Sequence, residues 1–173
     1  MEKVNLQRID SNRAEYMLLK NDSSYVDVRF NERTGGLLAI HREHHFDPTI
    51  GKFGLPRGDY ATIAAEELYQ PGNCVLLESE TSSYGIKGSE GLLDREKFDI
   101  KGVEGTGKRN IEYKIYNASE KGAKIAVLYY HDKSVFSAQN IVDGYSSYLR
   151  NSKSKKIKTV YYILDGELYK VNI

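Results

Sequence analysis

One short stretch, Lys97–Lys101, alternates charged and apolar side chains. Successive side chains of a strand point to opposite faces, so Asp99 and Lys101 are expected on one solvated face, and the apolar residues between them on the core side. Asp94 lies just before a tight turn and can fold back beside Asp99 across a hairpin. Two carboxylates and a lysine can hold Mg²⁺ through one or two oxygen ligands and orient a water. The stretch therefore predicts attack on a phosphodiester, although any strand with one solvated face can produce the same triplet.

The segment after this strand predicts a phosphate site. Gly-rich residues 102–107 lead into a helix that opens with Lys108, Arg109 and Asn110. The free N–H groups of a helix N-terminus attract anions, and two cations add to that attraction. We expect these three residues, together with Lys114 one turn later, to hold the backbone of a substrate.

These residues must be positioned by helices and strands, and the sequence pattern that predicts such elements becomes regular from about Asp59 onward. Hydrophobic periodicity and turn residues predict helices at 60–70, 108–121 and 137–150, and strands at 74–77, 90–93, 97–101, 124–131, 159–164 and 167–171. Before them, strands are expected at 14–20 and 25–30, and a loop at 48–58. The order predicts an α/β (α+β) fold with a mixed central sheet flanked by helices. We expect one compact domain, with an N-terminal β extension at 1–58 and a core at 59–173.

Composition excludes several classes of protein. A chain of 173 residues suits one domain, and its net charge of +1 argues against wholesale coating of nucleic acid. No stretch approaches the ~18 apolar residues of a membrane helix, and the first ten residues lack the apolar core of a signal peptide. A single cysteine, Cys74, excludes an internal disulfide framework and indicates a packing role. A soluble protein of a reducing compartment, the cytoplasm, is expected.

The order of a glutamate-bearing helix, a strand, Asp94, a turn, Asp99-x-Lys101, a helix and a strand resembles the core of PD-(D/E)xK nucleases. More closely, residues 91–131 (GLLDREKFDIKGVEGTGKRNIEYKIYNASEKGAKIAVLYYH) resemble the tRNA nuclease domain at the C-terminus of CdiA contact-dependent growth inhibition toxins. Related domains occur on phage and other mobile elements. The close resemblance covers residues 60–131, and residues 98–115 are its most specific part.

This resemblance implies a role for each matching residue. Asp94 would be the first metal-binding acid, Asp99 the second, and Lys101 the lysine of the motif. Glu67 is the preferred helix acid, with Glu66 as the alternative. The implied activity is that of a metal-dependent endonuclease using Mg²⁺ or another divalent cation, with RNA, and tRNA in particular, favoured over DNA.

The same resemblance bears on partners and location. If the chain is a toxin, a cognate immunity protein that covers its cationic face is expected, and secretion as part of a larger toxin stays open. An alternative from another class also stays open: a non-catalytic nucleic-acid-binding or phage-assembly module with the same fold.

A histidine cluster at residues 41–47 offers a second chemistry. His41 and His45 are four residues apart and would share a face if the segment were helical, as zinc ligands do. The pattern does not match that of a zinc protease, so a capping or substrate-facing role is favoured. A metal-independent RNase with a histidine such as His44 as general base is the alternative enzyme.

Two other features are candidates for nucleic-acid contact. Residues 150–158 hold five cations and no acid, which fits either a phosphate-tracking patch or a solvated loop. Six tyrosines could stack on bases, but their apolar neighbours predict that most belong to the core: Tyr129, Tyr130, Tyr145, Tyr148, Tyr161 and Tyr162.

Overall fold

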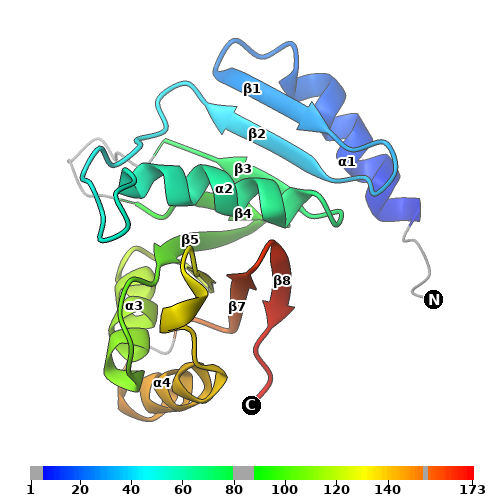
Figure 1. Cartoon of the computed structure of the whole chain (residues 1–173). Coiled ribbons are helices and arrows are strands. Elements are labelled where there is room, and N and C mark those ends of the chain that lie inside the picture. The colour runs from blue at the N-terminus through cyan, green and yellow to red at the C-terminus, as the bar shows by residue number, and fades with distance from the viewer. Residues whose placement is uncertain (1–5, 80–87, 154–155) are drawn as a thin grey trace.

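The computed structural model describes residues 6–79, 88–153 and 156–173 (Figure 1). Within these residues, one mixed sheet of eight strands follows the order of the chain: β1 (Tyr25–Phe30), β2 (Leu37–His41), β3 (Cys74–Leu77), β4 (Gly91–Leu93), β5 (Glu96–Gly102), β6 (Ile125–Tyr129), β7 (Thr159–Leu164) and β8 (Glu167–Lys170). The pairs β2–β3, β5–β6 and β6–β7 are parallel. The other neighbours are antiparallel.

Helices cover both faces of this sheet. They are α1 (Leu6–Leu19), α2 (Arg57–Tyr69), α3 (Lys108–Glu120) and α4 (Ala138–Asn151), and a 3₁₀ turn, η1 (Lys133–Val135), precedes α4. One face packs against α2 through residues such as Phe98, Ile100 and Val127. The alternate residues of the same strands face the other way, toward α1 at one end of the sheet and toward α3 and α4 at the other. Figure 1 shows α2 lying across the sheet while α3 and α4 lie together beside β5 and β7.

The β4–β5 hairpin sets the register of β5, the strand that carries Asp99 and Lys101. Leu93 pairs with Glu96, so only Asp94 and Arg95 form the turn. Both have positive φ, 48° and 71°, as a type I′ turn requires. Gly91 pairs with Phe98, and the preceding residue, Glu90, is therefore brought beside Asp99.

Most of the expected elements are confirmed. The strand at 74–77 matches β3, and the remaining helices and strands after residue 59 agree with the structure within a few residues. Asp165 and Gly166 form the expected tight turn between β7 and β8, both with positive φ. The α/β class with a mixed sheet is confirmed. Cys74 is buried in β3 among apolar side chains, as its expected packing role requires. No helix in the described part of the chain is long and apolar enough to cross a membrane.

The N-terminal region differs from expectation. The predicted strand at 14–20 is wrong, because this segment is the second half of α1. Asn12, Tyr16 and Leu19 recur at helical spacing, and Tyr16 and Leu19 pack on the apolar cluster of β2 and β3. The region is not an all-β extension, and its strands join the main sheet, since β2 pairs in parallel with β3.

Asn12 anchors α1 on the loops that flank β2 and β3. It is only 1% exposed, and its side-chain amide donates to the carbonyl oxygens of Gly35 at 2.9 Å and Gly72 at 3.5 Å. Replacing Asn12 with alanine should lower the free energy of unfolding by about 1–3 kcal/mol, because buried carbonyls lose their donor. Urea unfolding of the two proteins measures the difference. The matched control is Asn21→Ala, which removes an exposed bond to Met17 O; equal losses in the two variants would contradict this role of Asn12.

Candidate active site

Asp99 is the centre of the candidate site. It lies in the middle of β5 with 0% of its surface exposed. Its Oδ2 is 2.6 Å from Lys101 Nζ, and its Oδ1 is 3.4 Å from Lys121 Nζ. Lys101 comes from the same strand, whereas Lys121 is the residue that ends α3. The strand and the helix thus place two ammonium groups on one buried carboxylate.

The expectation that this side of β5 is solvated is wrong, although the alternation itself is correct. Asp99 pairs across the sheet with Ala126, which belongs to the cluster packed under α3 and α4. The side of β5 that carries Asp99 and Lys101 is therefore covered by a helical layer. Lys101 and Lys121 reach under that layer and place their ammonium groups beside the carboxylate.

Burial dominates the acid–base properties of this cluster. It raises the pKa of Asp99, and the nearby charges of Lys101 and Lys121 oppose that rise. Burial also lowers the pKa of Lys101, against the attraction of Asp99. Lys114 has a lowered pKa for the same reason, with the positive charge of Lys101 adding to the effect. The site thus holds one carboxyl and two ammonium groups whose charged forms are less favoured than in water.

A second carboxylate, that of Glu90, lies beside Asp99. Its charge contributes to the raised pKa of Asp99. Glu90 Oε2 is 3.2 Å from Nε2 of His44, whose side chain is 0% exposed. His44 Nδ1 is 2.6 Å from the carbonyl oxygen of Glu78, and because a carbonyl only accepts, Nδ1 donates this bond. The buried His44 ring therefore lies within ion-pair distance of the Glu90 carboxylate.

Glu90, Lys101 and Lys121 line a pocket of about 170 Å³ at the carboxyl end of β5, whereas the buried Asp99 is not itself among the lining residues. Its lining combines cations and carboxylates, supplied by Arg57, Lys101, Lys114, Lys121, Asp47, Glu90 and Glu104, together with His45 and Tyr60. The Tyr60 ring fits here because residue 102 is glycine; a Cβ at Gly102 would lie 2.4 Å from the ring. Tyr60 is 3% exposed, and its hydroxyl has no hydrogen-bond partner among the described residues. Such a buried polar group is unusual in a folded protein.

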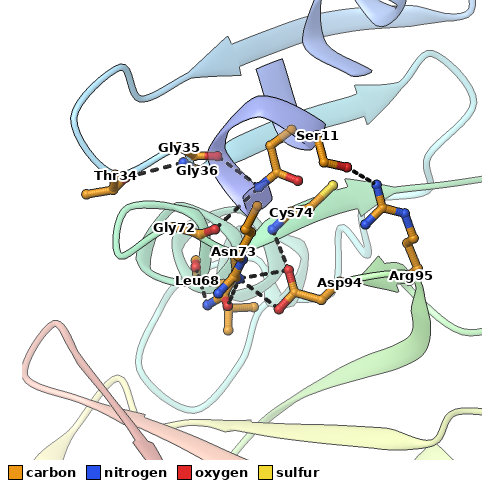
Figure 2. A network of polar contacts seen from close by, with 12 residues as sticks. Ser11, Thr34, Gly35, Gly36, Leu68, Gly72, Asn73, Cys74, Asp94 and Arg95 are labelled. Carbon is orange, nitrogen blue, oxygen red and sulfur yellow. Dashed lines mark hydrogen bonds and ion pairs between the residues drawn. The ribbon is translucent and has the colours of Figure 1, made fainter. Parts of the chain in front are cut away.

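Asp94 does not join this cluster. Figure 2 shows its carboxylate in a separate network at the turn between β4 and β5. It accepts a hydrogen bond from the backbone N–H of Cys74 at 2.8 Å and forms an ion pair with Arg8 of α1 at 2.9 Å. Arg8 also donates to the side chain of Asn73. These contacts tie the hairpin turn to α1 and β3, which is a structural role.

Neither helix acid reaches Asp99. Glu66 forms an ion pair with Arg29 of β1 at 2.9 Å. Glu67 lies on α2 beside the β7–β8 turn, within 4 Å of the position a Cβ would take at Gly166, and burial raises its pKa. Because α2 covers the face of the sheet opposite to Asp99, the structure does not bring Glu67 into the acidic cluster.

The expected phosphate-binding residues separate into three positions. Lys114 lines the pocket with Lys101. Arg109 lies on another side of α3, where it lines a groove between α3 and α4. Lys108 is exposed, and Asn110 donates to the carbonyl of Gly105 and closes the loop before the helix.

The histidine cluster is not helical, so the expected pairing of His41 with His45 on one helix face is absent. His41 ends β2, and its Nδ1 accepts a hydrogen bond from the backbone N–H of Glu43. His44 is buried against Glu90, while His45 lines the pocket. The cationic stretch at 150–158 is described only in part, since residues 154 and 155 lie outside the described ranges.

Sequence reasoning missed two members of the charged cluster around Asp99, namely Glu90 and Lys121, and also the pocket residues Arg57, Tyr60 and Glu104. Glu90 could have been found from the hairpin register: with a two-residue turn at 94 and 95, residue 90 falls opposite residue 99. Lys121 carries no such signal, because its contact with Asp99 depends on how α3 packs over β5. Compared with known protein families, with curated proteins and with solved structures, the chain gives no match.

The raised pKa of Asp99 predicts a pH dependence of stability. A carboxyl with a higher pKa in the folded state binds protons more tightly there, so its contribution to stability is full below the unfolded pKa of ~4 and falls as pH rises through the folded pKa. The free energy of unfolding of the native chain, minus that of Asp99→Asn, should therefore be constant below pH ~4, decrease as the pH rises further, and level off above the raised pKa. Urea titrations at several pH values measure this difference. A difference that increases with pH would contradict a raised pKa.

Proposed function

We propose that this chain is a metal-dependent phosphodiesterase that cleaves nucleic acid, with RNA, and tRNA in particular, as the substrate. The observation that carries the proposal is the buried carboxylate of Asp99, held by Lys101 and Lys121 next to Glu90 at a pocket lined by further cations. Titratable groups with perturbed pKa values in one pocket are typical of catalytic sites. The unpartnered Tyr60 hydroxyl in the same pocket further supports ligand binding.

The order of the elements supports the same proposal. Helix α2, the antiparallel strands β3, β4 and β5, helix α3 and the parallel strand β6 follow one another as in the nuclease core that the sequence resembles. In this arrangement Asp99-x-Lys101 occupies β5, and the neighbouring strand supplies the other acid. We propose Glu90, rather than Asp94, for that position, because Glu90 lines the pocket and Asp94 does not border it.

The residues present fit a magnesium ion better than zinc. Zinc in proteins takes three or four side-chain ligands. No group of three or more histidine, cysteine, aspartate or glutamate side chains suitable for a metal occurs in the described ranges. Magnesium is usually held by one or two carboxylates and keeps several waters. Glu90 and Asp99 would hold such an ion, which when bound activates a water for attack on phosphorus.

The other residues of the pocket would bind and orient the substrate. Lys101 and Lys114 provide positive charge where the scissile phosphate enters, and this charge stabilises the additional negative charge of the transition state. Their lowered pKa values mean that an anionic ligand restores the preference for the charged form. His44 holds Glu90 in place through its contact at 3.2 Å.

Two other functions remain testable against this one. A metal-independent RNase would need an accessible histidine; His45 lines the pocket, but the buried side chain of His44 is held between Glu78 and Glu90. A non-catalytic binding module would bind nucleic acid without cutting it. Cleavage that EDTA does not inhibit would favour the first alternative, and binding without cleavage would favour the second.

Asp99→Asn and Glu90→Gln should each lower the rate of tRNA cleavage by about 10²–10³-fold or more, since each removes a charge from the reacting centre. Glu67→Gln is the matched control, because it removes a carboxylate outside the pocket, and it should retain cleavage within a few-fold. Asp94→Asn keeps an oxygen that can accept from Cys74 N–H, so it should also retain cleavage if its thermal midpoint shows that the turn is intact. The assay follows intact tRNA and its fragments on denaturing gels with Mg²⁺ and with EDTA. Loss of cleavage in Asp94→Asn, with full activity in Glu90→Gln, would restore the sequence-based assignment of Asp94.

A further inference from the structure

A groove between α3 and α4 carries the most exposed tyrosines of the two helices. Tyr113 is 63% exposed and Tyr116 is 44% exposed, although both are large aromatic residues. They line a groove of about 570 Å³ together with Arg109, Tyr148 and Lys153. Exposed aromatic side chains that cluster at a groove are unusual on a protein surface and indicate a binding site.

We propose that this groove binds a single-stranded segment of nucleic acid through base stacking on Tyr113 and Tyr116. Aromatic side chains stack on bases of any sequence, and cations beside them attract the backbone. The inference rests on the proposed function for the identity of the ligand, and it adds the form of the substrate and the surface that recognises it.

Helix α3 has three sides with different surroundings: one packs on the sheet, one lines the candidate active site and one lines the tyrosine groove. Arg109, Tyr113 and Tyr116 follow one another at helical spacing and lie on one side. Ile111, Ile115 and Ala118 form the buried side. Lys114 follows Tyr113 by one residue, roughly 100° around the helix, and lines the candidate active site. Tyr116 follows Lys114 by two residues, roughly 160° around the helix, so the candidate active site and the tyrosine groove lie on different sides of α3.

The charge around the groove suits a nucleic acid as well. Arg109 and Lys153 line the groove and are exposed, so their positive charges can bind the phosphates of a nucleic acid. The groove also contains Glu112 and Glu120, which repel phosphates but can accept hydrogen bonds from base amino groups. Asn151, which donates to Glu112 at 3.0 Å, adds an amide for base edges. This mixture favours a strand with its bases turned inward and its backbone at the cations.

The base of the groove is closely packed and hydrogen-bonded. Tyr148 is 1% exposed, and its hydroxyl donates to Ser119 Oγ at 3.1 Å and accepts from the backbone N–H of Ile157 at 3.2 Å. Helices α3 and α4 approach closely because residue 144 is glycine; a Cβ at Gly144 would lie 2.7 Å from the carbonyl oxygen of Lys108. The rings of Tyr113 and Tyr116 thus lie over a packed base, so binding of a base does not require α3 and α4 to move apart.

A binding experiment without cleavage tests the proposal. Fluorescence anisotropy of an end-labelled single-stranded RNA 12-mer is measured in EDTA, with the native full chain and with Tyr113→Ala/Tyr116→Ala. The double variant should bind about tenfold or more weakly, because stacking contributes roughly 1–3 kcal/mol per base. The matched control, Tyr113→Phe/Tyr116→Phe, keeps both rings and should bind within about twofold of the native chain. Circular dichroism spectra and thermal midpoints verify that both variants fold.

Two results would overturn the proposal: native-like binding by the double alanine variant, and equal affinity of the native chain for the single strand and for its duplex. Arg109→Gln/Lys153→Gln should also lower the salt dependence of binding, by up to ~0.7 in slope for each phosphate that the variant no longer neutralises. Failure of the proposed function is separable from this test. Tyrosine-dependent binding without any cleavage of tRNA in Mg²⁺ would refute the nuclease and support the groove, whereas cleavage with tyrosine-independent binding would do the reverse.

Discussion

The buried ion pairs of Asp99 are the constraint on which the site depends. A carboxylate inside a sheet loses its hydration, at a cost of several kcal/mol, unless cations and hydrogen-bond donors replace the water. Lys101 supplies one cation from two residues along β5, but Lys121 reaches Asp99 only if α3 ends above that strand. The position of α3 is therefore coupled to the charge of one side chain. Apolar residues of similar volume would often stabilise such a position more, so stability alone does not explain the charged cluster.

The two faces of β5 explain why a strand can serve both the core and the site. Phe98 and Ile100 pack under α2 and hold the strand in the sheet. Asp99 and Lys101 point to the other face, where α3 leaves the pocket open at the carboxyl end of the strand. A shift of one residue in the hairpin register would exchange these faces. The two-residue turn at Asp94 and Arg95 therefore determines which side chains enter the pocket, and the network around Asp94 stabilises that turn.

Local patterns were sufficient for most of the fold. Apolar runs bounded by glycine, proline and aspartate turns located β3, β5 and the β7–β8 hairpin, because each of these elements buries a face of its own sequence. They failed for α1, whose buried positions are few and include the polar Asn12. For the site, alternation put Asp99 and Lys101 together, whereas Lys121 depends on packing between distant elements. The hairpin register places Glu90 opposite Asp99, but the sequence analysis chose Asp94, which is closer to Asp99 along the chain, as the other acid.

Helix α3 links the core, the pocket and the tyrosine groove. Its buried side, formed by Ile111, Ile115 and Ala118, fixes the helix over β5 and β6. A second side places Lys114 and the terminal Lys121 at the pocket, and a third presents Tyr113 and Tyr116 to solvent. Because the three sides belong to one helix, a phosphate at the lysines and a base at the tyrosines would lie at a fixed separation in the proposed complex. Such a separation would favour a flexible single strand, whose backbone can adapt, over a stiff duplex, whose bases are already stacked on one another.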